Sequence, residues 1–190
     1  MKSHETFPFL TLFLVALCVS VFALQNVASA ELQAQLKFTP LFALERPWTF
    51  ITSVFLHAST LHLVSNMFWL IIFGFALESY IGVSRKYILA TFLIAGAAGG
   101  FSDILTIPVF ASSLGASGAI GGLVGLRAIS DPSTVSIMMA FLYAMVSIMG
   151  LVSPTDNVAH GSHLAGLLVG VALGYYFVKT KKISSSVWVN

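Results

Sequence analysis

Apolar residues occupy most of the chain, in long runs that are separated by short polar segments. The runs cover about residues 9–28, 60–81, 87–105, 117–131, 134–152 and 161–178. A helix rises about 1.5 Å per residue, so about 20 apolar residues cross the roughly 30 Å of membrane hydrocarbon. The pattern predicts an all-α membrane protein, a bundle of six transmembrane helices with a short fourth helix that starts at Ser117.

The first connection, residues 29–49, is the only long one and mixes apolar with charged positions. Such a mixture is typical of a segment that lies in the membrane interface. The first run, with Lys2 before it and "ASA" at 28–30, also resembles a cleavable signal peptide. It is long for that purpose, and its removal would leave five helices, so we expect a membrane helix. We find no internal repeat and expect residues 1–190 to form one domain.

The composition agrees with a membrane location. Of 190 residues, 57% are hydrophobic and only 8% are charged, whereas soluble domains carry roughly 25% charged residues. The net charge of +2 says nothing about nucleic acid, but no basic run is long enough to suggest such a partner, and we expect none. The single cysteine, Cys18, excludes an intrachain disulfide and a cysteine-based metal site, and we expect it to be structural.

Lysine and arginine residues predict the orientation. Six helices place both termini on one side of the membrane, together with Lys2, Arg85, Lys86, Arg127, Lys179, Lys181 and Lys182. The opposite side carries only Lys37 and Arg46. Because cytoplasmic loops are enriched in Lys and Arg, we expect a multi-pass protein of the cell membrane with both termini in the cytoplasm. The long first loop then faces outward.

Polar groups on three of the predicted helices fall at a similar depth, in the outer half of the membrane. Counted from the inner helix ends, Ser117 lies about 21 Å up, and His163 and Asn66 lie about 24 Å up. His62 is one turn above Asn66. Polar groups inside membrane helices are costly, and this makes them candidates for function.

These residue types suit nucleophilic catalysis. A serine hydroxyl attacks well only when a base takes its proton, and histidine is the usual base, so Ser117 and His163 could form that pair. The count puts Asp103 and Asp156 toward the outer loops, and no carboxylate remains at the depth of the histidine. The residues therefore favour a Ser-His dyad over a triad.

Attack on an amide also creates an oxyanion, which needs hydrogen-bond donors. His62 and Asn66 are spaced i, i+4, so they share one helix face, and both side chains can donate. The Ser117 N–H is a third donor, at the favourable N-terminal end of a helix dipole. His62 and Asn66 are therefore candidates for the oxyanion site.

Each group also has a structural interpretation. Small residues around Ser117, such as Gly118-xxx-Gly122, let helices approach closely, and Asn66 alone could join two helices. Glycines recur every four residues on the last helix, and we interpret them as packing positions that bring His163 toward Ser117: Gly166, Gly170 and Gly174. Glu78, near the inner end of the second helix, is interpreted as a structural hydrogen-bond partner.

Five segments together resemble the rhomboid intramembrane serine proteases, over roughly residues 48–174. They are "TSVFLHAS" at 52–59, "HLVSN" at 62–66, "GFALESYIG" at 74–82, "GASG" at 115–118 and "HLAGLLVG" at 163–170. A single Gly-x-Ser-Gly would be weak evidence. Several motifs in the right order and on matching helices are specific, and the six-helix count is similar to the minimal form of the family.

The resemblance implies that Ser117 is a nucleophile, that His163 is its general base, and that His62, Asn66 and Gly115 line the oxyanion and substrate site. It implies that Gly118, Gly166, Gly170 and Glu78 support the site. The implied activity is cleavage of single-span or multi-span membrane proteins at small and helix-destabilising residues, through an acyl-enzyme. The resemblance also implies a water-filled cavity open to the outside, and neither a cofactor nor a metal.

The chain departs from the family pattern at two positions. Family members often have Trp-Arg before the second helix, whereas this chain has Trp48-Thr49. Some members place an aromatic residue, packed on the catalytic histidine, where this chain has Gly121, so His163 must be held by another group. The resemblance also places a gate at residues 134–157, with Phe141 and Tyr143 as candidate lid aromatics.

Two other functions stay open. Four histidines gather toward the outer side of the second and sixth helices and could serve a metal-dependent protein: His57, His62, His160 and His163. The sequence lacks an H-E-x-x-H motif, and glycine spacing favours His163 over His160 as the base. A catalytically silent rhomboid relative that binds membrane clients is the second alternative, although this chain keeps both the serine and the histidine.

Overall fold

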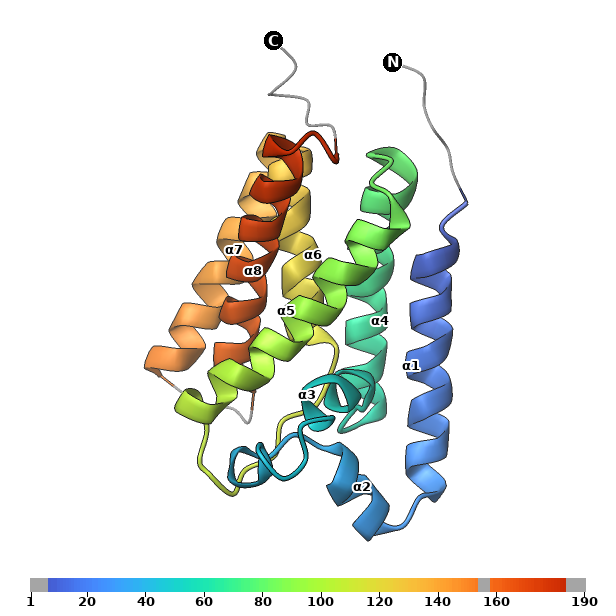
Figure 1. Ribbon diagram of the computed structural model, residues 1–190, viewed down its shortest axis with the longest axis vertical. Coiled ribbons are helices and arrows are strands. Elements are labelled where there is room, and N and C mark those ends of the chain that lie inside the picture. Colours follow the sequence, from blue (N-terminus) through green and yellow to red (C-terminus); the bar gives the residue numbers. More distant parts are fainter. Residues whose placement is uncertain (1–6, 154–157, 184–190) are drawn as a thin grey trace.

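The computed structural model of the protein describes residues 7–153 and 158–183, and these residues form a helical bundle (Figure 1). Its long helices are α1 (Phe9–Val27), α4 (Thr60–Phe75), α5 (Arg85–Thr106), α6 (Ser117–Ser130), α7 (Thr134–Val152) and α8 (His160–Lys179). A π-helical turn, η3 (Ala76–Tyr80), extends α4. Five of these helices are long and apolar enough to span a membrane, and α6 is a shorter helix of 14 residues. The predicted all-helical membrane bundle with a short fourth helix is confirmed.

Helix boundaries follow local sequence signals. Ser59 caps α4 by accepting a hydrogen bond from the His62 N–H, and Ser133 caps α7 by accepting one from the Ser136 N–H. The α6 helix ends at Ser130, directly before Asp131-Pro132, because proline disfavours helical backbone at the residue before it. Gly82, with a φ of 72°, turns the chain between η3 and α5.

The long first loop folds into short helices at the end of the bundle opposite to the start of α1 and the end of α8 (Figure 1). They are α2 (Ala30–Leu36), η1 (Pro40–Phe42), α3 (Thr49–Thr52) and η2 (Ser53–Phe55). Side chains from the following segment satisfy carbonyls at the end of α2: Arg46 donates to Ala34 O at 3.1 Å, Trp48 to Gln35 O at 2.8 Å and Thr52 to Leu36 O at 2.8 Å. These bonds anchor the loop although Thr49 replaces the expected arginine.

The α6 helix lies at the centre of the bundle, in contact with α4, α5, α7 and α8, and its closest neighbour is α8. Most of its residues are buried. At Gly166 and Gly170 of α8, an added side chain would overlap the carbonyls of Gly118 and Gly122. The glycines therefore allow the two main chains to meet, as expected for small residues at membrane helix interfaces.

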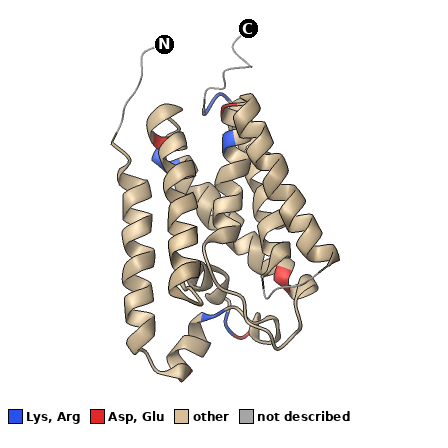
Figure 2. Ribbon diagram, turned by 180° about the vertical axis from the view of Figure 1, so that it is seen from behind, with Lys and Arg blue, Asp and Glu red and all other residues tan. Residues whose placement is uncertain are grey.

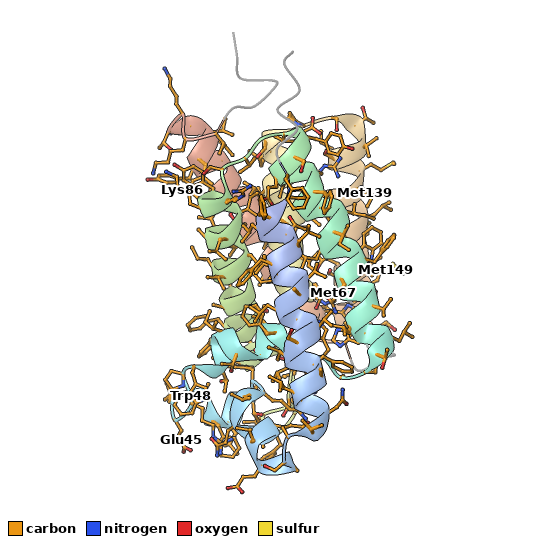
Figure 3. All side chains as sticks on the ribbon, turned by 90° about the vertical axis from the view of Figure 1, so that its right-hand side faces the viewer. Glu45, Trp48, Met67, Lys86, Met139 and Met149 are labelled. Atoms are coloured by element: carbon orange, nitrogen blue, oxygen red, sulfur yellow. The ribbon has the colours of Figure 1, made fainter. Side chains whose placement is uncertain are left out.

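Charged residues lie near the two ends of the bundle, and the middle of the helices carries none of the coloured charges among the described residues (Figure 2). Glu45 and Trp48 lie at one end and Lys86 at the other (Figure 3). Glu78 is 2% exposed and holds α1 to α4: its carboxylate accepts from Leu10 N at 3.0 Å, Thr11 N at 3.0 Å and Arg85 Nε at 2.6 Å. These contacts are those of the structural hydrogen-bond partner that the sequence suggests.

Candidate active site

Ser117 is the first residue of α6, and the loop before it sets its position. Gly115 has a φ of 126°, which a side-chain-bearing residue rarely adopts, and its N–H donates to Ser53 O at 2.9 Å. A Cβ at Gly115 would lie 2.7 Å from the His62 ring. Glycine therefore lets the loop pass between Ser53 and His62 and deliver Ser117 to the helix start.

His163 comes to Ser117 from α8. Its Nε2 lies 2.7 Å from Ser117 Oγ, although the two residues are 46 positions apart in the chain. Both side chains are half-buried, so they are within reach of a bound molecule. A hydroxyl and an imidazole nitrogen at this distance meet the geometric requirement for a nucleophile and its base.

His62 and Asn66 lie one turn apart on the same face of α4, and the His62 ring lies against the Gly115 loop. The Ala58 N–H approaches His62 Nδ1 at 3.4 Å, an arrangement that leaves Nε2 as the protonated nitrogen. The Nε2 edge of that ring faces the Gly115 loop. Asn66 is buried, and its Nδ2 donates to His62 O at 2.9 Å, which leaves its second N–H for another acceptor.

The structure places Ser117 beside His163 and Gly115 beside His62, and Asn66 lies one turn from His62 on α4. Gly115 lies at the site, but its N–H already donates to Ser53 O, so it supplies shape rather than a hydrogen bond. The other candidate donors are the Ser117 N–H, the His62 ring and the Asn66 amide. A cavity of about 30 Å³ borders Ser117, Gly115 and Ser162, which exceeds the roughly 10–15 Å³ that one water molecule needs.

The assignment of Asp103 to an outer loop is wrong. Asp103 lies inside α5, is 0% exposed, and accepts a hydrogen bond from Ser113 Oγ at 2.5 Å. The hydroxyl of Ser162, directly before His163, interacts with the same carboxylate. The carboxylate is buried because the loop after α5 folds back over the end of the helix, where Ser113 contacts it. Asp156 lies outside the described residues.

The histidines form two pairs. The rings of His57 and His62 are 5.3 Å apart, and those of His160 and His163 are 5.7 Å apart. Within residues 7–153 and 158–183, no group of three or more His, Cys, Asp or Glu side chains is placed to hold a metal ion. His160 is buried and lies against Gly150 of α7, not at the opening of the active site.

Tyr143 lies near the Ser117–His163 pair, although the sequence analysis gave it a different role. Tyr143 of α7 donates from its hydroxyl to Ser117 O at 2.7 Å, and its ring centroid lies 5.7 Å from that of His163. The lid hypothesis had grouped it with Phe141, which is 60% exposed on the same helix. The sequence did hold a signal for this role. Gly121 replaces the aromatic residue that packs on the histidine in some family members, so another group had to hold His163.

Comparison with known proteins agrees with this geometry. The sequence model of the Rhomboid domain matches residues 44–180. The chain is 36% identical over 137 residues to RHOMBOID-like protein 6, mitochondrial, of Arabidopsis thaliana, an alignment that covers 67% of this chain and 43% of the relative.

Two bacterial relatives match over more of the chain. It is 28% identical over 180 residues to the rhomboid protease GlpG of Klebsiella pneumoniae, covering 90% of this chain and 64% of the relative. It is 28% identical over 185 residues to the rhomboid protease GlpG of Haemophilus influenzae, an alignment that covers 92% of this chain and 94% of the relative. The chain thus spans less than two thirds of the first two relatives. The match of the Rhomboid domain to most of the sequence shows that the chain belongs to the rhomboid family.

Proposed function

We propose that this protein is an intramembrane serine endopeptidase that hydrolyses peptide bonds in or near transmembrane segments of other membrane proteins. The observation that carries the proposal is the 2.7 Å distance between His163 Nε2 and Ser117 Oγ, in a chain of the rhomboid family. The relatives named rhomboid protease GlpG support the same activity.

In the proposed first step, Ser117 Oγ attacks the carbonyl carbon of the scissile bond while His163 Nε2 takes the hydroxyl proton. The carbonyl oxygen becomes an oxyanion. The Ser117 N–H at the start of α6, the His62 Nε2–H and the free N–H of Asn66 are the donors for that charge. The protonated His163 then gives its proton to the leaving amine, and an acyl-enzyme remains on Ser117.

The second half of the reaction needs water. The 30 Å³ cavity beside Ser117 has room for a water molecule within the bundle. His163, neutral again after the first step, takes a proton from that water, which attacks the acyl carbonyl. The resulting tetrahedral intermediate then releases the carboxyl product while His163 returns its proton to Ser117 Oγ, which restores the starting state.

The site geometry also limits the substrates. A helical segment hides its carbonyls in its own hydrogen bonds, so a cleaved segment must become extended. Helix-destabilising residues near the cut therefore favour cleavage, and the family resemblance implies small residues there; membrane proteins with both, in a lipid bilayer, are the proposed partners. The seven-to-two distribution of Lys and Arg supports cytoplasmic termini, with the site open to the outer side.

The test is cleavage of a model single-span substrate with a small-residue juxtamembrane segment by purified protein in liposomes. We expect wild type to cut it and the Ser117→Ala and His163→Ala proteins to fail. Persistent cleavage by Ser117→Ala protein would overturn the dyad, and loss of cleavage in a chelator would favour the metal-dependent alternative.

A silent client-binding relative is separated by a second measurement. A fluorophosphonate probe labels an activated serine without any need for the correct protein substrate. We expect labelling of wild type that disappears in Ser117→Ala protein. Folded wild-type protein that neither cuts nor takes the label would contradict the proposed function.

A further inference from the structure

The α7 helix packs against α8 and α6, and one of its residues reaches the active site. Only Ser136 and Ser147 are buried along its length, and many of its apolar side chains are exposed. At mid-length, however, Tyr143 points inward and donates to Ser117 O at 2.7 Å. The hydroxyl of this residue therefore ties α7 to the main chain of the nucleophile.

The same side chain also touches the base. The Tyr143 and His163 ring centroids lie 5.7 Å apart with a 43° angle between the rings, within the range of a favourable aromatic contact. One residue thus contacts both members of the Ser117–His163 pair, through a hydrogen bond on one side and ring packing on the other. It meets no reacting atom, because its bond is to the Ser117 carbonyl.

Gly121 makes room for this arrangement. A Cβ at position 121 would lie 2.9 Å from the Tyr143 hydroxyl, 3.0 Å from its ring and 2.9 Å from His163 O. These separations are shorter than ordinary van der Waals contacts, so a side chain there would displace Tyr143, His163 or both. The Tyr143 side chain of α7 therefore fills the space that the absent side chain of Gly121 leaves on α6.

We propose that Tyr143 is a positioning residue for the Ser117–His163 dyad, and that it makes the geometry of the dyad depend on α7 being seated against α6. The proposal rests on the proposed function. It replaces the lid role considered for Tyr143: an outward displacement of α7 would remove the hydrogen bond to Ser117 O and the ring against His163 in one movement.

The first test is Tyr143→Phe, which keeps the ring and removes only the hydroxyl. We expect kcat and the rate of fluorophosphonate labelling to fall roughly 3- to 10-fold, the effect of one lost hydrogen bond, with KM changed less than about twofold. Tyr143→Ala, which also removes the ring, should lose more. Tyr175→Phe is the matched control, because Tyr175 is 53% exposed and makes no contact with the dyad. A change in KM alone, or unchanged labelling, would overturn the proposal.

The second test asks whether Gly121 and Tyr143 act on the same contact. Gly121→Ala should slow labelling, and the Gly121→Ala/Tyr143→Phe double variant should stay within about twofold of Gly121→Ala alone, because the contact is already lost. If the two effects multiply instead, the residues act independently and the shared-space argument is wrong.

A third measurement does not need activity. Imidazole nitrogen NMR signals of His163, assigned with His163→Ala protein, should shift in Tyr143→Phe but not in Tyr175→Phe protein. Unchanged His163 signals would overturn the positioning role even for an active enzyme. Shifted signals in a protein that neither cuts nor labels would retain the Tyr143 contact while contradicting the proposed function.

Discussion

Gly166 of α8 lies directly against the main chain of Gly118 of α6, one residue after the proposed nucleophile, and an added side chain at Gly166 would overlap the Gly118 carbonyl. Gly166 is also three residues after His163. The two helices therefore come very close together within one turn of both Ser117 and His163. A change in helix spacing at this point must change the Oγ–Nε2 distance.

Gly166→Ala should separate the helices and remove most activity. We expect at least about a 100-fold loss of fluorophosphonate labelling, because productive geometry tolerates little misplacement. The thermal midpoint should fall as well. Gly174→Ala is the graded control on the same helix, because its Cβ would lie 3.0 Å from the Ile129 Cβ and 3.4 Å from the nearest main-chain atom, and would not overlap a carbonyl. If both variants label equally well, close packing at Gly166 does not position the dyad.

Much of the architecture could be predicted because membranes impose a strong length requirement. Long apolar runs gave the five spanning helices to within about two residues, and proline after Asp131 marked the end of α6. The approach of Ser117 to His163 was predicted from their similar depth, since each position along a helix has a fixed rise, and from the rhomboid-like motifs that carry both residues. Repeating glycines indicated that the two helices could meet.

Contacts that depend on rotation about a helix axis or on loop path could not be predicted. Tyr143 faces inward while Phe141, two residues earlier, is exposed, and α7 is too uniformly apolar to show which face packs. Asp103 was misplaced because the loop before α6 folds back onto the end of α5, where the Ser113 hydroxyl donates to the Asp103 carboxylate. No local sequence signal specifies that contact.

Glu78→Gln should loosen α1 without altering the site. The carboxylate accepts four hydrogen bonds, one of them from Arg85, and a neutral amide cannot accept them all. We expect a loss of roughly 1–3 kcal/mol of stability, the cost of a buried donor that is left without its acceptor, seen as a lower thermal midpoint. Glu45→Gln, at an exposed position, is the control and should leave the midpoint unchanged. An unchanged midpoint in Glu78→Gln would contradict the anchoring role.

His57 should make stability fall in mild acid. It is 0% exposed, and burial, followed by the nearby His62, lowers its pKa from 6.5 to about 4. Between pH 6.5 and pH 4 the unfolded chain therefore binds a proton that the folded chain excludes, and stability decreases as the pH falls. One pKa unit corresponds to 1.36 kcal/mol, so the loss at pH 5 is at most roughly 2 kcal/mol.

The measurement is the thermal midpoint of wild type and His57→Asn protein from pH 7.5 to pH 5. Histidines at other positions titrate in both proteins, so the difference between the two curves isolates His57. We expect the wild-type midpoint to fall more steeply. Parallel curves would show that His57 is not held neutral by burial.

Asp103 should stabilise the loop that delivers Ser117. Its carboxylate accepts from Ser113 in that loop and interacts with Ser162 beside His163, so it joins α5 to both sides of the site. Asp103→Ala would leave the Ser113 hydroxyl without its acceptor, at a cost of about 1–3 kcal/mol. Asp103→Asn keeps an acceptor oxygen for Ser113 and should be milder. We expect labelling to fall in the order wild type, Asn, Ala.

Asp131→Asn is the matched control for this prediction. Asp131 also accepts from two serine hydroxyls, those of Ser133 and Ser136 at 3.1 Å each, but at the start of α7, at the opposite end of the bundle. The Asp131→Asn substitution should lower the thermal midpoint while leaving the labelling rate unchanged. Equal labelling rates in Asp103→Ala and Asp131→Asn would mean that Asp103 contributes to folding alone, because only an Asp103 that fixes the loop can alter the reactivity of Ser117.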